Sequence, residues 1–277
     1  MRLVAVGDVL VDVVCAEAPP PGGRVHTDVA LRAGGSAVNA AVSAVALGAS
    51  ASVVGRVGAD PAGDLVAASL AADGVTAHLA RDSELRTGVA VVLLSNGDAG
   101  VVADRGANAR LSPADVPDPL EGDALLVSGF ALLQRGSDEA ARTALERFQG
   151  DWAAVDLASP RLAARAHLDD VTRGASVVFA TAEEARAVTG AEPEEAARSL
   201  ASRFSIACVK LGSEGALAAQ GDVVERGAAA PVERGYPFGA GDAFAAAFLV
   251  SLTGGDPLVR ALERACEAGA SAARGRG

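Results

Sequence analysis

The stretch GGSAVNAAVSAVALGASASVVGRVGADPAGD, residues 34–64, carries the alternation that decides the fold. A glycine pair opens a helical pattern at Ala37–Leu47, a strand pattern follows at Ala51–Gly55, and a second helical pattern fills Pro61–Ala72. A strand between two helices is typical of α/β proteins with a parallel sheet. Asp60, directly before the second helix, is explained by a structural role as the cap of that helix.

The same rhythm continues outward in both directions along the chain. Further strand patterns lie at Leu3–Val6, Ala124–Val127, Ala153–Asp156, Ser176–Phe179 and Ile206–Val209, and further helical patterns at Asp138–Phe148, Glu183–Val188, Pro193–Arg203, Gly241–Leu252 and Leu258–Ala273. The sequence therefore predicts an α/β fold with a mainly parallel sheet covered by helices on both faces. Since there is no internal repeat or linker, we expect a single domain over residues 1–277.

Two segments break the rhythm, because no helical pattern follows either of them. Val25–Leu31 and Val89–Asp104 have strand patterns with turns, and the second contains the hairpin signal SNGD at Ser95–Asp98. We expect these regions, about residues 12–33 and 87–106, to form a small antiparallel β lid that excludes water from a reaction. Ordinary surface hairpins are the alternative.

The composition limits the classes of partner. The chain has 277 residues and a formal net charge of −11, which argues against nucleic-acid and anionic-membrane partners. Its cysteines, Cys15, Cys208 and Cys266, contain no CxxC pair and indicate neither a zinc site nor a disulfide framework. Asp8 and Asp12 interrupt the first apolar run, which predicts a buried strand rather than a signal peptide. We therefore expect a cytoplasmic protein.

The segment Gly239-Ala240-Gly241-Asp242 opens an alanine-rich helix near the C-terminus. Glycines allow a tight turn and the close approach of a ligand, and the free N–H groups of a helix start attract anions. Asp242 could accept a proton from a hydroxyl group as its oxygen attacks a phosphoryl group. The alternative is that Asp242 only complements the helix dipole.

A second glycine-rich segment precedes the helix at residues 37–47. Gly34 and Gly35 permit the close approach of a small ligand, and Asn39, one turn into the helix, offers a donor and an acceptor to hydroxyl groups. A plain strand-to-helix turn with an exposed asparagine is the alternative. Because each segment is ambiguous alone, their order along the chain carries more information than either does.

In order and rough spacing, these motifs resemble the ribokinase-like (PfkB) carbohydrate kinase family. Residues 34–64 match its early signature, and GAGDAFAAAF at 239–248 matches its late one. Between them, Thr87-Gly88, Arg105-Gly106-Ala107-Asn108, Glu183-Glu184 and Lys210-Leu211-Gly212-Ser213-Glu214-Gly215 follow the order of the family. The resemblance covers almost the whole chain. It implies a ribokinase-like three-layer α/β/α domain with a small β lid, and an enzyme that uses ATP and Mg²⁺ to phosphorylate a hydroxyl group of a sugar-like small molecule.

The resemblance also implies a role for each matching residue. Asp242 would be the catalytic base, and the backbone amides of Gly239, Ala240 and Gly241 would stabilise the transferring phosphoryl group. The implied substrate-binding residues are Asp12, Gly34, Gly35, Asn39 and Asn108. The implied nucleotide-binding residues are Thr181, Lys210, Gly212, Gly215 and Cys266. Glu184 would organise the magnesium ion through water.

Three positions depart from the family pattern. Tyr236-Pro237-Phe238 stands where the family has an acidic side chain that helps to bind a monovalent cation, and the chain ends at Arg274–Gly277, about where a loop should close that site. We therefore expect the monovalent cation site to be absent. Thr181 and Cys266 each replace a usual asparagine near the nucleotide, which predicts weak nucleotide binding or an unusual nucleotide preference.

Other functions stay open at this point. A nucleoside kinase on the same fold is disfavoured by the low aromatic content of 3%, and a ligand-binding or regulatory kinase homologue is motivated by residues 236–238. A dinucleotide-dependent dehydrogenase is disfavoured because neither GxGxxG nor a P-loop appears. Arg105 would suit a substrate with a carboxylate or phosphate, or lie solvated on the lid. The apolar alternation of Val89, Val91 and Leu93 permits a homodimer through the lid and equally a monomer.

Overall fold

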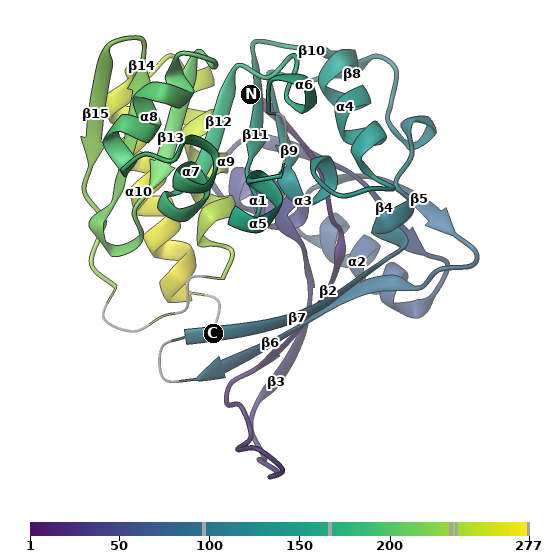
Figure 1. The fold of residues 1–277 in the computed structure, drawn as a ribbon. Helices are drawn as coiled ribbons and strands as arrows, with labels where there is room; N and C mark the ends of the chain where they lie inside the picture. The colour runs from purple at the N-terminus through teal and green to yellow at the C-terminus, as the bar shows by residue number, and fades with distance from the viewer. Residues whose placement is uncertain (96–97, 166–167, 233–234, 236–237, 276–277) are drawn as a thin grey trace.

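The computed structural model describes residues 1–95, 98–165, 168–232, 235 and 238–275. Within these residues, a 9-stranded sheet has the order β15-β14-β13-β12-β11-β9-β1-β4-β5 (Figure 1). The strands from β13 to β5 are parallel to their neighbours, and β14 and β15 extend the sheet antiparallel at one edge. Their bounds are β1 Arg2–Val6, β4 Ser50–Gly58, β5 Thr76–Asp82, β9 Ala124–Ser128, β11 Trp152–Asp156, β12 Val177–Thr181, β13 Ile206–Lys210, β14 Ala216–Gln220 and β15 Val223–Gly227.

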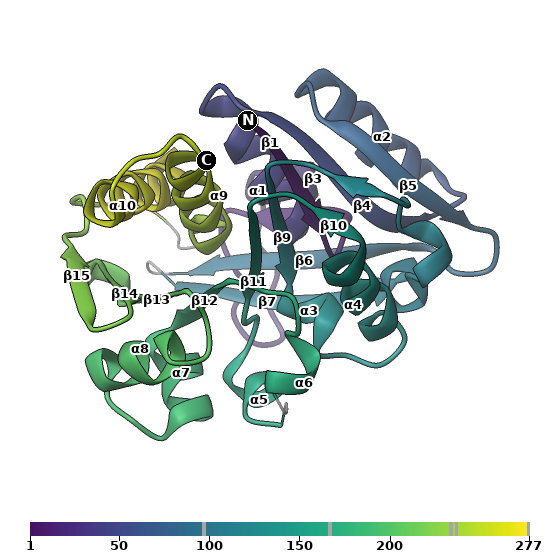
Figure 2. The same cartoon turned by 90° about the horizontal axis from the view of Figure 1, so that it is seen from above.

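Helices cover both faces of this sheet (Figure 2). One face carries α1 (Ser36–Ala46), α2 (Pro61–Ala72), α9 (Ala240–Thr253) and α10 (Leu258–Gly275), and the other carries α3 (Gly129–Leu132), α4 (Asp138–Arg147), α7 (Ala182–Thr189) and α8 (Pro193–Ala201). Short helices α5 (Pro160–Ala163) and α6 (Leu168–Val171) and the 3₁₀ turns η1 (Ala107–Arg110), η2 (Pro113–Asp115) and η3 (Gly212–Glu214) connect the larger elements. The predicted three-layer α/β/α arrangement is confirmed.

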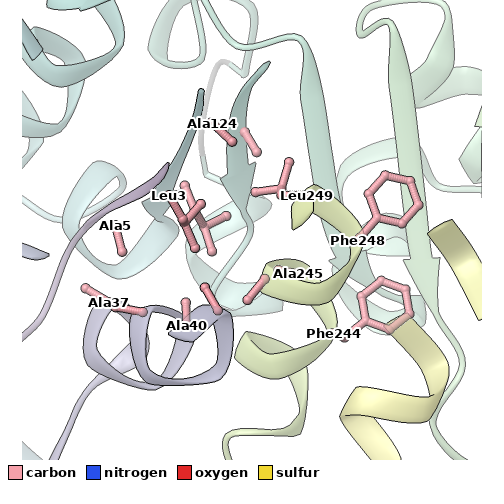
Figure 3. Close-up of a cluster of buried hydrophobic side chains, with 14 of the residues drawn as sticks. Leu3, Ala5, Ala37, Ala40, Ala124, Phe244, Ala245, Phe248 and Leu249 are labelled. Atoms are coloured by element: carbon pink, nitrogen blue, oxygen red, sulfur yellow. The ribbon is translucent and has the colours of Figure 1, made fainter. Parts of the chain in front are cut away.

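Alternate residues of β1 explain why both faces are covered. Leu3 and Ala5 point into the core under α1 and α9, and Val4 and Val6 point into the core on the opposite face, to which α3 and α4 contribute. Figure 3 shows the first of these cores, where α1 contributes mainly alanines. Small side chains let the helix backbone approach the sheet closely. This close packing brings α1 and α9 side by side.

A second sheet of four strands projects from the carboxyl ends of the large sheet (Figure 1). Its order is β3-β2-β6-β7, with bounds β2 Leu10–Cys15, β3 Val29–Gly34, β6 Thr87–Ser95 and β7 Asp98–Gly106. We call it the small sheet. The regions 12–33 and 87–106, predicted as a lid, supply its strands, although β2 and β6 pair in parallel rather than antiparallel. Asn96 and Gly97 of the predicted hairpin turn lie outside the described residues.

Three strands, the edge strands β5 and β15 and their neighbour β14, which pairs with β15, are not predicted by the sequence patterns. Two further short strands, β8 (Leu120–Glu121) and β10 (Phe148–Gln149), pair with each other apart from both sheets. Among the described helices, none is long and apolar enough to cross a membrane.

Candidate active site

The segment at residues 239–242 forms the start of α9. Gly239 precedes the helix with a left-handed backbone at φ 78°, which favours glycine because a Cβ atom is strained there. Asp242 lies in the first turn, and its Oδ2 atom accepts a hydrogen bond of 2.9 Å from Nδ2 of Asn39. The structure thus joins the two glycine-rich segments at their polar side chains, although these residues are 203 positions apart.

Gly35 places Asn39 by setting the start of α1. Its φ of 96° is left-handed, and a Cβ atom there would overlap the carbonyl oxygen of Asp8. Asn39 lies in the first turn of α1, which packs against α9, and its side chain is only 4% exposed. The buried amide is therefore held by packing and points at the carboxylate of Asp242.

Asp12 comes from the small sheet. It is 1% exposed on β2, and a Cβ atom at Gly34 would overlap its carboxylate oxygens. Gly34 is therefore needed for the close approach of the two strands. Arg32 stands directly opposite Asp12 in the antiparallel ladder, which places both side chains on one face of the small sheet.

Phe238 links the small sheet to the glycine turn at residues 239–242. It packs against a buried apolar cluster of Val14, Val92 and Leu94, which project from β2 and β6. Val14 is two residues beyond Asp12 and so projects from the same face of β2. The face that carries Asp12 therefore meets the chain directly before Gly239.

Asn108 serves as a clamp at the base of the small sheet. Its Oδ1 atom accepts a hydrogen bond from the backbone N–H of Val9, and its Nδ2 atom donates to the carbonyl oxygens of Val9 and Arg105. These bonds use both amide hydrogens and fix the β1–β2 connection to the end of β7. The predicted contact of Asn108 with a substrate stays a prediction, and its donors are already engaged.

Arg105 is engaged in the same region rather than solvated. Its Nε and Nη2 atoms donate to the two carboxylate oxygens of Asp8 at 2.9 and 2.7 Å, and Nη2 also donates to Oγ of Ser137. Asp8 is 7% exposed. Bidentate pairing of this kind is geometrically specific, so this pair ties β7 to the end of β1.

Thr181 and Glu184 form the start of α7. The Glu184 carboxylate accepts a hydrogen bond from the backbone N–H of Thr181, and Oγ1 of Thr181 accepts one from the N–H of Glu184. This reciprocal pair is a capping box, in which each side chain satisfies a free N–H of the helix end. Burial, with a smaller effect of the nearby Asp156 carboxylate, raises the pKa of Glu184 to about 7.

Lys210 and Asp156 end two strands of the large sheet, and sequence reasoning missed Asp156. The Nζ atom of Lys210 donates to both oxygens of Asp156, at 2.8 Å each. A Cβ atom on Gly241 would lie 3.3 Å from the same Nζ atom. The ammonium group is therefore beside the glycine turn at residues 239–242. The sequence held one signal of a functional role for Asp156: it is an acidic residue at the carboxyl end of a buried strand, and α/β proteins bind ligands at such ends.

The remaining predicted nucleotide-binding residues lie towards the β15 edge. Gly212 begins η3 and Gly215 follows it, with φ values of 62° and 92°, and a Cβ atom on Gly215 would overlap the carbonyl oxygen of Gly227. Cys266 on α10 is 7% exposed in the core, where a Cβ atom on Gly227 would lie 3.1 Å from its sulfur. Burial raises the pKa of the Cys266 thiol to about 11, so it stays neutral and apolar in character.

The Glu184 carboxylate and the backbone N–H groups of the glycine turn fit a magnesium ion that is bound mainly through the phosphates of a nucleotide. Within the described parts of the chain, no group of three or more His, Cys, Asp or Glu side chains is arranged to hold a metal ion. Magnesium is usually bound by one or two carboxylates, waters and the substrate phosphates rather than by an all-protein cage. Glu184 could contribute such a carboxylate, and the glycine turn offers backbone donors to phosphate.

Comparison with known proteins gives a consistent result. A family model described as pfkB family carbohydrate kinase matches residues 1–277. The 2-dehydro-3-deoxygalactonokinase of Haloferax volcanii is 30% identical over 290 residues, covering 94% of this chain and 87% of that enzyme. The ribokinase of Bacillus subtilis is 37% identical over 89 residues, covering only 32% of this chain and 30% of that enzyme. A structure of a putative ribokinase II from E. coli in complex with ATP and Mg²⁺ superposes with a TM-score of 0.88 at 23% identity, covering 100% of this chain and 94% of that one.

Proposed function

Because this chain belongs to the pfkB family of carbohydrate kinases, we propose that it transfers the γ-phosphoryl group of ATP to a hydroxyl group of a sugar or sugar-like small molecule. The hydrogen bond from Nδ2 of Asn39 to Oδ2 of Asp242 supports this most directly. It joins the helix expected to bind substrate hydroxyls to the carboxylate expected to take their proton. A hydroxyl group bound by Asn39 would therefore lie within reach of Asp242.

The side chains at the site have complementary roles in this proposal. Asp242 orients the acceptor hydroxyl group and takes its proton as the oxygen attacks, and Asn39 holds the carboxylate in place. The free amides of Gly239, Ala240 and Gly241 donate to the phosphoryl oxygens as negative charge develops. ATP with Mg²⁺ supplies the phosphoryl group, and Glu184 lies ready to order the hydration of the ion.

The small sheet completes the acceptor site in this proposal. Asp12 accepts hydrogen bonds from further hydroxyl groups of the acceptor, close to Gly34 and Gly35. Phe238, which packs against Val14, Val92 and Leu94, would cover the approach to the glycine turn at residues 239–242. Excluding water there favours transfer to the acceptor over hydrolysis of ATP.

The hydrogen bonds of Arg105 to Asp8 narrow the range of acceptors that the site would recognise. Asp8 already balances its charge through two hydrogen bonds, so Arg105 gives little support to a carboxylate or phosphate on the substrate. The match to a 2-dehydro-3-deoxygalactonokinase still favours including sugar acids among the acceptors tested. Nucleosides belong in the same test, because Phe238 directly precedes the glycine turn and an aromatic ring there could stack on a nucleobase.

The test is a phosphorylation screen of sugars, sugar acids and nucleosides with ATP and Mg²⁺, repeated with Asp242→Asn. We expect one acceptor class to turn over, and the Asp242→Asn variant to lose about 10²- to 10⁴-fold in kcat while its fold is retained. Asp64→Asn is the matched control, because Asp64 occupies the first turn of α2 without any role at the site. It should keep full activity.

Two outcomes would contradict the proposal. Full activity in Asp242→Asn would exclude this residue as the base. Binding of ligands without transfer to any acceptor would favour a regulatory or ligand-binding homologue.

Two expectations from the sequence stay predictions. Tyr236 and Pro237 lie outside the described residues, so the absence of a monovalent cation site rests on the sequence alone. Equal kinase rates with and without potassium would support it, and strong activation by potassium would contradict it. The cytoplasmic location likewise stays a prediction.

A further inference from the structure

Lys210 is held in one position at the end of β13. Its Nζ atom donates to both carboxylate oxygens of Asp156 at 2.8 Å, and the two side chains are only 14% and 17% exposed. An ammonium group has three hydrogens, and this pairing uses two of them. The third hydrogen is available to a further acceptor.

The ammonium group that carries this hydrogen lies beside the glycine turn at residues 239–242. The Nζ atom is 3.3 Å from the position that a Cβ atom would take on Gly241, one residue before Asp242. A side chain at position 241 would crowd the ammonium group, whereas glycine leaves the space between them open to a ligand. The phosphoryl group in the proposed reaction passes over this same turn.

Charges around Lys210 keep it protonated. Burial alone would lower the pKa of Lys210, but the Asp156 carboxylate, with smaller effects of Glu184 and Asp242, raises the pKa above its ordinary value. A buried ion pair is costly to assemble, and replacing it with apolar side chains is often neutral or stabilising. The ion pair between Lys210 and Asp156 is therefore expected to add little to the free energy of unfolding, which favours a functional role for it.

We propose that Lys210 is a catalytic residue of the phosphoryl transfer, and that Asp156 is the positioning residue that directs its ammonium group at the transferring phosphoryl oxygens. This rests on the proposed kinase function and goes beyond a general nucleotide contact. The acceptor oxygen forms the new bond to the γ-phosphorus as the bond to the ADP oxygen breaks. The hydroxyl proton goes to Asp242, and Lys210 keeps its own proton throughout. Its fixed positive charge offsets the negative charge on the equatorial oxygens.

The proposal is tested first by nucleotide binding, which needs no acceptor. Calorimetry with Mg²⁺ compares AMP-PNP, which has a third phosphoryl group, with ADP, which lacks it. Lys210→Met should weaken AMP-PNP binding by about 10- to 100-fold, the loss expected for one charge-assisted hydrogen bond, and change ADP binding by less than about threefold. Equal changes for both nucleotides, or none for AMP-PNP, would overturn the proposal.

Removing Lys210 alone leaves Asp156 buried without its partner, which could unfold the protein. The double variant Asp156→Asn/Lys210→Gln removes both charges and keeps hydrogen-bonding groups at both positions. It should fold and show the same selective loss for AMP-PNP. Arg142→Gln is the control, because it removes one positive charge from α4 in an ion pair with Asp138. It should bind both nucleotides as the unmodified protein does.

Turnover then separates this proposal from the function on which it rests. With a working acceptor, Lys210→Met should lose roughly 100-fold in kcat, and normal kcat would overturn the role of Lys210 while leaving the kinase function intact. If the unmodified protein phosphorylates no acceptor, the kinase function fails. The selective loss for AMP-PNP would still support the contact of Lys210 with the terminal phosphoryl group, and its absence would overturn that contact.

Discussion

At the scale of single residues, the candidate site consists of polar side chains that hold one another in place. The amide of Asn39 holds Asp242, the carboxylate of Asp156 holds Lys210, and Asn108 holds the backbone of Val9. Each of these contacts crosses between elements far apart along the chain. A side chain that is fixed before substrate arrives needs no reorganisation during the reaction, which favours catalysis.

Asn39→Ala tests this arrangement at the carboxylate of Asp242, the proposed base. The variant removes one hydrogen bond to a charged group, worth about 1.5–3 kcal/mol, so we expect kcat/KM to fall by roughly 10- to 100-fold. Ser43→Ala is the control on the same helix, because its hydroxyl group donates to the backbone carbonyl oxygen of Asn39 and not to the Asn39 side chain. Steady-state kinetics with the acceptor from the screen measures both. An Asn39→Ala variant as active as Ser43→Ala would show that Asp242 needs no such support.

The residues of the site differ in how well the sequence predicts them. Asn39 and Asp242 lie in glycine-rich motifs, and the motifs are local enough to be found in the sequence. Asp156 lies in no motif, because its role depends on Lys210 from a strand two positions away in the sheet. The backbone clamp of Asn108 was not predictable for the same reason, since it requires Val9, 99 positions earlier, to lie beside it.

At the scale of elements, α1 is positioned by glycines at both ends. Gly35 begins it with φ 96°, and Gly48 follows it with φ 86°. The two glycines share a left-handed backbone but differ in their surroundings. A Cβ atom would overlap the carbonyl oxygen of Asp8 at Gly35, whereas nothing lies within 4 Å of one at Gly48. Gly35 is therefore required for packing as well as for backbone conformation.

The matched pair Gly35→Ala and Gly48→Ala separates these two effects. Gly48→Ala should lower the free energy of unfolding by about 1–2 kcal/mol, the cost of a left-handed backbone. Gly35→Ala should lower it by a further ~1–3 kcal/mol, because the new methyl group must displace the β1–β2 connection. Urea unfolding measures both values. Equal losses in the free energy of unfolding would indicate that the β1–β2 connection at Asp8 can shift at little cost.

The same scale shows why helix α2 is predicted better than strand β14. Helix α2 is predicted at its observed bounds, because its apolar period, Pro61 and the Asp60 cap are all local signals. The confirmed cap also explains Asp60 without any role at the active site. Strand β14 has the sequence ALAAQ, and alanine has little preference for strands, so only its pairing with β13 places it in the sheet.

At the scale of the whole molecule, the small sheet has one face turned to the active site and one turned outward. Leu31, Val13, Val91 and Val102 are aligned across its four strands by the observed register. Leu31 and Val102, at the two edges, are 62% and 69% exposed. A continuous apolar row on an outer sheet face is typical of an association surface. This row is therefore the surface through which we expect the predicted homodimer to form.

We expect the protein to be a dimer at micromolar concentration, and Leu31→Lys/Val102→Lys to make it a monomer. Charges on this row would have to be buried without partners in a dimer. Light scattering coupled to gel filtration measures the mass of both proteins. Val223→Lys is the control, since Val223 on β15 is 54% exposed and lies away from the small sheet. A monomeric parent protein would contradict the prediction.

The contact between Asn39 and Asp242 also bears on how the chain acquires activity during synthesis. The two residues are 203 positions apart, and Asp12 comes earlier still. A growing chain can form the early strands and α1 while it is still being translated, since domains begin to fold from their first-made parts. It cannot form the hydrogen bond between Asn39 and Asp242 until residue 242 has left the ribosome. A partly made chain is therefore expected to lack this contact, and with it the proposed kinase activity, until the start of α9 has been synthesised.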